Sequence, residues 1–200
     1  FLQMLERVRI ALFAIDEAHC ISEWGHNFRP DYLKLADIVR ALEARSNGSL
    51  RVLALTATAT PAVVKDIRAA FQIDDDSAIL TGFYRPNLEL SIQPTTPEKR
   101  DALLIERITS RPLGPSIVYV TLQKTAERLA KMLREEAKLE VEAYHAGMEA
   151  EARSAVQERW KASDKRIVVA TIAFGMGIDK SDVRYVFHYN LPKSLESYSQ

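Results

Sequence analysis

The sequence contains a single cysteine, and its net charge is zero. Each of these two features excludes a class of protein. Cys20 has no partner for an internal disulfide and no second cysteine with which to hold a metal, so we expect a small buried packing residue. A lone thiol fits a reducing compartment. The 27 basic and 27 acidic residues cancel, so no globally basic surface steers the chain to nucleic acid. Any contact with nucleic acid must come from local patches and aromatic side chains.

Long apolar runs and a phosphate-binding glycine loop are also missing. No segment approaches the length of a membrane span and no signal-peptide pattern opens the chain, so no membrane contact is expected. The sequence holds no Gly-x-x-x-x-Gly-Lys-Ser/Thr, the loop whose backbone amides and lysine hold nucleotide phosphates. The chain opens at Phe1 rather than methionine and stops in a helix-like segment, so we expect a piece of a longer protein.

The most informative stretch runs from Asp16 to His26 and reads DEAHCISEWGH. The apolar run 10–15 precedes it and fits a fully buried central strand of a parallel sheet, although a buried helix segment has the same composition. Ligand sites in open α/β sheets lie at the carboxyl ends of such strands. The adjacent carboxylates of Asp16 and Glu17 suit a magnesium ion beside a nucleotide phosphate, and Glu17 suits the orientation or deprotonation of a water. The alternative is that both residues cap the next helix.

Strand-like and helix-like segments alternate along the chain, a pattern typical of α/β proteins with parallel sheets. Thr60 and Pro61 predict the N-cap and first turn of a helix. Residues 93–98 are rich in proline and short hydroxyl side chains and predict a linker, so we place a domain boundary near Thr95. The predicted helices are 31–45, one starting at 61, 98–110 and one containing Leu129 and Leu133. The predicted strands are 10–15, 50–55, 116–120, 141–144 and 167–171. We expect 10–15 and 50–55 to be fully buried and 167–171 to be buried as well.

Several of these segments resemble the motifs of one family. Asp16-Glu17-Ala18-His19 is similar to the Walker B motif of DEAH-type superfamily 2 helicases, and the segment from Cys20 to Tyr32 resembles the aromatic-rich loop of RecQ DNA helicases. Later segments resemble further RecQ motifs in the family's order, at 56–58, 82–88, 116–123, 144–147, 167–180 and 191–200. The resemblance implies two RecA-like parallel-sheet domains. Residues 1–95 would form the C-terminal half of the ATP-binding domain and 96–200 most of the second domain.

The resemblance also assigns roles to individual residues. Asp16 would hold magnesium with ATP, and Glu17 and His19 would complete the catalytic group. Thr56 and Thr58 would couple hydrolysis to movement. The remaining ATP contacts would be Gly177, Asp179 and Gln200, although Asp179 is placed to meet either the ATP ribose or the domain interface. The DNA contacts would be Trp24, His26, Phe28, Arg29 and Thr171.

Chemistry supports the assignment of the aromatic loop. Trp24 and Phe28 can each stack on an unstacked base, a contact worth about 1–3 kcal/mol that does not depend on base sequence. Arg29 can pair with phosphate or stack on a ring. The alternative is that both aromatic residues belong to an ordinary core. For His145, in the Tyr-His-Ala-Gly turn, we expect a structural or backbone-contacting role rather than catalysis.

The activity implied is that of an ATP-dependent helicase that translocates from 3′ to 5′ on single-stranded DNA and unwinds duplexes in recombination and repair. ATP and magnesium are the implied cofactors, and no zinc is expected because the family's cysteine-rich region is absent. Either a bacterial cytoplasm, near the nucleoid, or a nucleus would suit this activity. An RNA helicase of the same superfamily is an alternative, which the aromatic loop argues against. A catalytically dead nucleic-acid scaffold is another, which Asp16 and Glu17 argue against.

The 200 residues by themselves are predicted neither to bind ATP tightly nor to hydrolyse it. The phosphate-binding loop is absent, and the arginine finger of the family, a group worth roughly 10³–10⁵ in rate in comparable NTPases, would follow Gln200. Phosphate release from ATP, measured with and without single-stranded DNA, checks this expectation. DNA-stimulated turnover by the isolated chain would contradict it.

Overall fold

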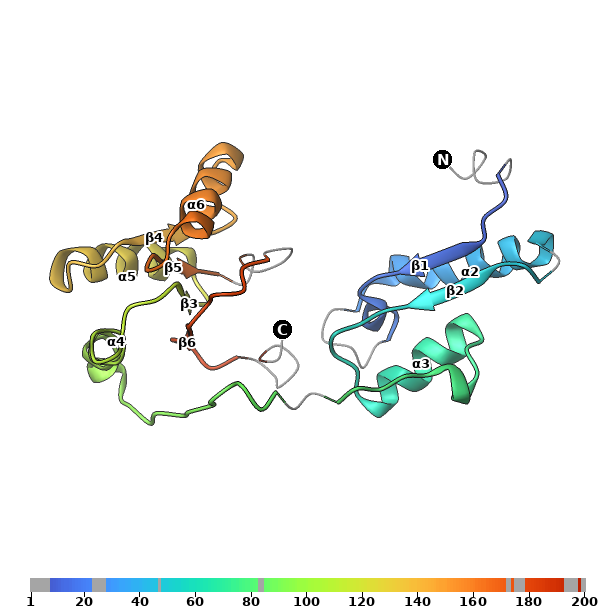
Figure 1. Cartoon of the computed structure of the whole chain (residues 1–200), viewed down its shortest axis with the longest axis horizontal. Helices are drawn as coiled ribbons and strands as arrows, with labels where there is room; N and C mark the ends of the chain where they lie inside the picture. The colour runs from blue at the N-terminus through green and yellow to red at the C-terminus, as the bar shows by residue number, and fades with distance from the viewer. Residues whose placement is uncertain are drawn as a thin grey trace. The chain divides into compact units, whose positions relative to one another are not determined.

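The computed structural model describes residues 8–22, 28–46, 48–82, 85–171, 174, 179–192 and 198. It divides into two compact units, with the division between Glu89 and Leu90 (Figure 1). The first unit contains the described residues up to Glu89 together with Tyr198, and the second spans Leu90–Pro192. Within the described residues, no helix combines the length and the apolar character needed to cross a membrane.

The first unit is built on two parallel strands. Strands β1 (Leu12–Ile15) and β2 (Arg51–Ala54) pair over their whole length, and helix α2 (Pro30–Ser46) connects them. Helix α3 (Pro61–Phe71) follows β2, and the short 3-10 helices η1 and η2 cover Ala18–Ile21 and Asp75–Ser77. Both α-helices pack on the same face of the strands (Figure 1). The buried core between them consists of Ile15, Ala18, Ile21, Ala36, Val39, Val63, Ile67 and Phe71.

Local sequence explains where α3 begins and ends. The side-chain hydroxyl of Thr60 accepts a hydrogen bond from the Val63 N–H at 3.4 Å, and Pro61 occupies the first turn, where a missing N–H costs nothing. Gln72 adopts a left-handed conformation with φ of 54° and ends the helix. The predicted helix start is confirmed.

The prediction that the first two strands are fully buried is wrong for the described structure. Successive strand residues point to opposite faces, and α2 and α3 cover only one of them. Phe13 and Ile15 face the helices, whereas Leu12 and Leu53 remain 54% and 42% exposed on the other face. A continuous apolar run therefore did not distinguish a strand covered on one face from a strand covered on both.

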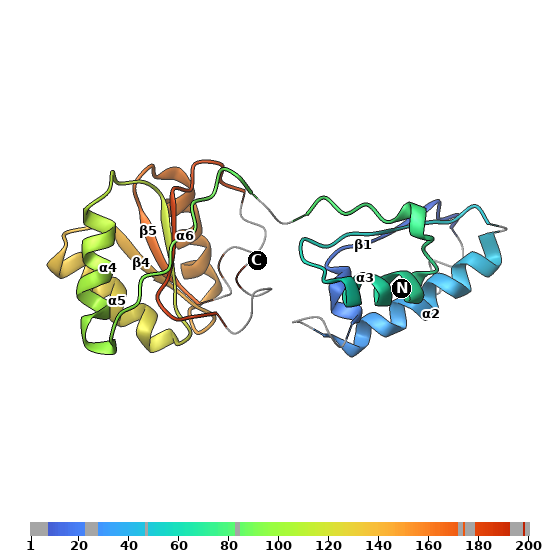
Figure 2. The same cartoon turned by 90° about the horizontal axis from the view of Figure 1, so that it is seen from below.

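The second unit is a four-stranded parallel sheet with the strand order β4-β5-β3-β6. Helices α4 and α5 cover one face of the sheet and α6 covers the other (Figure 2). The strands are β3 (Ser116–Tyr119), β4 (Val141–Tyr144), β5 (Ile167–Ala170) and β6 (Tyr185–His188). The helices are α4 (Arg100–Thr109), which follows the 3-10 turn η3 (Pro97–Lys99), α5 (Gln123–Glu136) and α6 (Ala150–Ala162). Both units confirm the predicted parallel α/β class, and α6 was not predicted.

The core on the α6 side is aromatic. Trp160 is fully buried, and its indole N–H donates to the Ser116 carbonyl at 3.2 Å. Phe174, also buried, packs edge-on against Trp160 and Tyr144 with ring centroids 5.2 and 4.8 Å apart. The Tyr119 hydroxyl donates to the Phe174 carbonyl at 2.7 Å. Phe174 is thereby fixed by both its ring and its backbone just beyond the end of β5.

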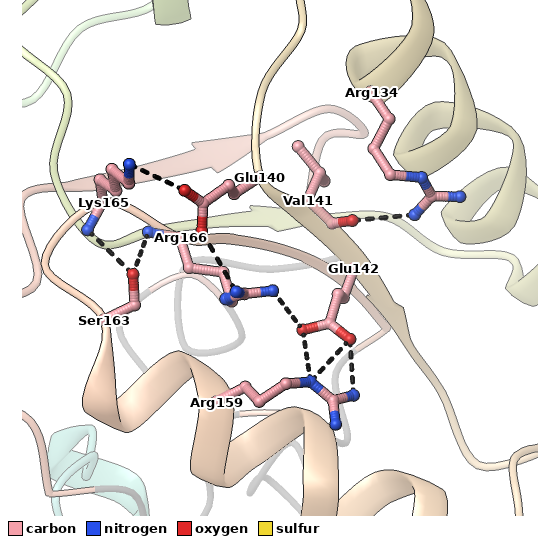
Figure 3. Close-up of polar contacts among 8 residues, drawn as sticks. All are labelled: Arg134, Glu140, Val141, Glu142, Arg159, Ser163, Lys165 and Arg166. Carbon is pink, nitrogen blue, oxygen red and sulfur yellow. Dashed lines mark hydrogen bonds and ion pairs between the residues drawn. The ribbon is translucent and has the colours of Figure 1, made fainter.

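Ion pairs hold the edge strand β4 to its neighbours (Figure 3). The Glu142 carboxylate accepts from Arg159 of α6 at 2.6 and 3.1 Å and from Arg166, next to β5, at 2.9 Å. Glu140 accepts from the same Arg166 at 3.1 Å and pairs with Lys165 at 2.8 Å. Burial raises the pKa of Glu142, but the hydrogen bonds and charges of the two arginines outweigh burial and leave that pKa below its usual value.

Glu142→Gln is predicted to lower the free energy of unfolding of the chain by about 1–2 kcal/mol near neutral pH, because Arg159 and Arg166 lose a charged, half-buried acceptor. Since the pKa of Glu142 is lower in the folded protein, this stabilisation exists above the unfolded pKa of about 4.3 and disappears as the pH falls through the folded value. Urea denaturation at pH 7 and below pH 4 measures both effects. The exposed residue Glu106, changed to Gln, serves as the control, and a pH-independent difference would contradict the prediction.

Candidate functional site

The two carboxylates lie at the carboxyl end of β1, directly after Ile15. Glu17 adopts a left-handed backbone with φ of 50° and ψ of 41°, an uncommon conformation for a residue other than glycine that clusters at functional sites. Its N–H donates to Asp16 Oδ1 at 2.8 Å, and the next N–H, of Ala18, donates to the Leu55 carbonyl at 2.9 Å. The backbone turn thus fixes both carboxylates beside the end of β2.

These carboxylates fit a hard divalent cation better than a helix cap. Glu17 occupies the N-cap position of η1 but makes no side-chain capping bond. Its Oε2 atom is buried, lies 3.3 Å from His19 Nδ1 and forms no hydrogen bond with the described residues, and Asp16 is exposed. Magnesium takes one or two protein carboxylates and completes its shell with phosphate oxygens and water. The described residues contain no group of three or more His, Cys, Asp and Glu side chains that could hold a metal ion. A cation at Asp16 and Glu17 would therefore need phosphate oxygens or water as further ligands.

A buried hydrogen-bond chain joins the ends of the two strands. His19 is 1% exposed, and its Nδ1 lies 2.9 Å from Thr56 Oγ1 and 3.3 Å from Glu17 Oε2. The Thr56 hydroxyl donates to the Thr58 carbonyl at 3.0 Å and accepts from the Thr58 N–H at 3.2 Å. When the Thr56 hydroxyl donates to the Thr58 carbonyl, it accepts from His19, and the hydrogen of a neutral His19 ring then sits on Nδ1. We assign this tautomer to His19.

The flanks of the predicted aromatic loop are tied to the same turn. The Arg29 N–H donates to the Cys20 carbonyl at 2.8 Å, and the Tyr32 hydroxyl donates to the Asp16 carbonyl at 3.2 Å. Phe28 is half-buried and the Arg29 side chain is exposed, whereas Trp24 and His26 lie outside the described residues.

The single thiol of the chain, Cys20, has a packing role. Cys20 is 2% exposed, and burial raises the pKa of its thiol, so the thiolate that a nucleophile needs is disfavoured. The prediction of a buried packing residue is confirmed.

In the second unit, Thr171 and Asp179, two of the residues predicted to bind ATP or DNA, lie beyond the carboxyl end of β5. Thr171 is half-buried, and its N–H donates to the Tyr144 carbonyl at 3.2 Å. Asp179 is exposed, and Gly177 and Gln200 lie outside the described residues. His145 is buried, and its Nε2 lies 3.2 Å from Glu127 Oε1.

Two contacts at the first site were not anticipated from sequence. Ser22 donates to Asp66 of α3 at 2.5 Å and so fixes the end of η1, and Tyr32 holds the Asp16 carbonyl. Asp66 is 44 residues from Ser22, and no local pattern links such positions. Tyr32 ends the segment 20–32 that resembles the family's aromatic loop, and this position was the only hint in the sequence that it could contact the site.

Comparison with known proteins gives two family matches. Residues 2–67 match the family described as DEAD/DEAH box helicase, and residues 98–200 match the helicase conserved C-terminal domain. RecQ-like DNA helicase blm-1 of Caenorhabditis elegans is 42% identical over 200 residues, which cover 100% of this chain and 20% of that relative. The probable ATP-dependent DNA helicase RecS of Bacillus subtilis is 39% identical over 201 residues, covering 100% of this chain and 39% of that relative.

A solved structure shows the same fold at lower sequence identity. A Dbp5 variant from Saccharomyces cerevisiae bound to RNA and ADP BeF3 matches with a TM-score of 0.70 at 19% identity, covering 99% of this chain and 52% of that one. The likeness confirms the RecA-like fold. The chain spans between about a fifth and two fifths of the length of the two curated relatives.

Thr56→Val is predicted to lower the free energy of unfolding by about 1–3 kcal/mol, because it leaves the His19 Nδ1–H and the Thr58 N–H without their acceptor. Thr109→Val, which removes an exposed hydroxyl from α4, is the matched control. Urea denaturation compares the two variants.

Ring ¹⁵N chemical shifts of His19 near pH 8 test the assigned tautomer in the unmodified chain. A dominant Nε2–H tautomer would contradict the hydrogen-bond chain.

Proposed function

Because the chain belongs to the helicases with the conserved C-terminal domain and matches RecQ-like DNA helicases along its whole length, we propose that it forms part of the motor of an ATP-dependent DNA helicase. The observation that carries the proposal is the pair Asp16 and Glu17, held at the carboxyl end of β1 by a left-handed turn. The DNA substrate is supported by relatives near 40% identity that are named DNA helicases.

The proposed roles of the carboxylates follow from their surroundings. Bound ATP with magnesium supplies the phosphoryl group to be cleaved and the cation that neutralises its charge. Exposed Asp16 holds the cation, and Glu17, whose Oε2 has no hydrogen-bond partner among the described residues, orients the attacking water and accepts its proton. The Glu17 N–H bond to Asp16 Oδ1 keeps the two carboxylates in a fixed mutual orientation.

The buried histidine gives this site a link to β2. His19 lies 3.3 Å from Glu17 and 2.9 Å from Thr56, which in turn bonds Thr58. A displacement of the residues after β2 therefore reaches the catalytic carboxylate through one imidazole ring. This arrangement supports the coupling role of Thr56 and Thr58, in which hydrolysis is converted into movement.

DNA would be held by stacking and by phosphate contacts rather than by net charge. Trp24, His26 and Phe28 supply ring faces, and Arg29 supplies a cation for a phosphate. Thr171 is the proposed phosphate contact in the second unit, while Gly177, Asp179 and Gln200 are proposed to face ATP. Successive closing and opening on ATP would move single-stranded DNA from 3′ to 5′ and unwind a duplex ahead of it.

The test is the ATPase rate of the intact protein with no nucleic acid, with single-stranded DNA and with single-stranded RNA. Strong stimulation by DNA is expected. Glu17→Gln should lower the stimulated rate by about 10²–10⁴, because the proton acceptor is lost. Trp24→Ala should retain the basal rate and lose most of the DNA stimulation. Glu89→Gln, an exposed carboxylate outside the site, is the control.

Two results would contradict the proposal. Stronger stimulation by RNA than by DNA would identify an RNA helicase. No hydrolysis with any nucleic acid would identify a scaffold that retains the fold.

A further inference from the structure

Lys180 is a buried cation that no part of the proposed function uses. Its side chain is only 7% exposed, although lysine is almost never buried unless it is paired. It follows Asp179 directly, beyond the end of β5. Its surroundings are therefore informative about how this part of the chain is held.

Three groups of opposite or partial negative charge surround the ammonium group. Lys180 Nζ lies 2.8 Å from Asp182 Oδ1 and donates to the Lys161 carbonyl at 3.0 Å. It also lies 5.6 Å from the centroid of the Trp160 ring, within the range of a cation–π contact. The Lys161 carbonyl belongs to the last turn of α6, where carbonyls lack helical partners and the helix dipole is negative. Each contact places negative charge or electron density beside the ammonium group.

These contacts fix the chain on the C-terminal side of a glycine-containing segment. In sequence, Gly175 and Gly177 separate Lys180 from Phe174. Phe174 is fixed on the N-terminal side by its buried ring and by the Tyr119 hydroxyl. Trp160 contacts both ends, since it packs against the Phe174 ring and under the Lys180 ammonium. The buried indole of Trp160 thus contacts both of these described residues.

We propose that Lys180 is a positioning residue, which holds the backbone at Asp179 against the end of α6 so that Asp179 is presented in one place. Among the described residues, Lys180 is bonded to the end of α6 directly after Asp179, and Phe174 is packed on Trp160 of the same helix on the N-terminal side. The part of this inference that concerns what Asp179 contacts, ATP or the surface of the other domain, rests on the proposed function. The anchoring itself does not.

The test compares Lys180→Met with Lys161→Met in the intact protein. Lys180→Met keeps the length of the side chain and removes its charge, whereas Lys161→Met changes an exposed lysine whose backbone carbonyl is retained. Asp182→Asn is a milder second variant, which weakens the ion pair and leaves the cation in place. Hydrogen exchange should become faster in the amides of residues 179–184 for Lys180→Met, less so for Asp182→Asn, and not for Lys161→Met.

Steady-state ATP hydrolysis, measured well below the melting temperature of each variant, then separates positioning from stability alone. A displaced Asp179 should lower kcat/KM for ATP about tenfold or more in Lys180→Met, as misplacement of a binding group does. A rise in KM at constant kcat supports a contact with ATP, and a fall in kcat at constant KM supports a contact between domains.

Unchanged exchange at residues 179–184 would overturn the anchoring. Faster exchange with unchanged kcat and KM would overturn the positioning role and leave Lys180 as a helix-capping residue only. An unmodified protein without ATPase activity would contradict the proposed function instead, while hydrogen exchange would still decide the anchoring.

Discussion

The parallel pairing of strands is the constraint on which both units depend. Parallel strands end at the same edge, so residues far apart in sequence meet there without any local signal. In the first unit this brings Glu17 and His19, after β1, to Thr56, after β2, 37 residues from His19. In the second unit it brings the N–H of Thr171, after β5, to the carbonyl of Tyr144 in β4. Each proposed contact group is assembled by strand order rather than by sequence proximity.

Much of the fold followed from sequence because its signals are local. The start of α3 depends on a hydroxyl and a proline within four residues, and the sequence shows both. Helix α6 was not predicted because its apolar residues are few, and its buried side depends on Val156 and on Trp160, whose partners lie on β3 and after β5. The one-sided burial of β1 could not be predicted either. Its apolar residues run continuously, and only the position of α2 and α3 decides which of them are covered.

The features of the candidate site can likewise be separated into those with a local sequence signal and those that depend on distant contacts. Asp16 and Glu17 could be proposed as a site because adjacent carboxylates after an apolar strand suit a hard cation, and the resemblance of the surrounding segment favoured this proposal over a helix cap. The left-handed backbone of Glu17 and the tautomer of His19 could not be predicted, because they depend on contacts with Leu55 and Thr56. The role of Lys180 could not be predicted from sequence for the same reason. In sequence it is one of many charged residues, and only its burial against α6 distinguishes it from a solvated lysine.

The hydrogen bonds around Asp16 and Glu17 suggest how the predicted aromatic loop would influence ATP hydrolysis. The backbone from Asp16 to Cys20 is bonded at one end to the Tyr32 hydroxyl and at the other to the Arg29 N–H. Arg29 is itself one of the predicted DNA contacts, and Tyr32 follows them in sequence and belongs to α2. A shift of the chain at Arg29 therefore acts directly on the turn that orients Glu17. No long relay through the core is required, because these two hydrogen bonds join Arg29 and Tyr32 to both ends of the turn that carries Asp16 and Glu17.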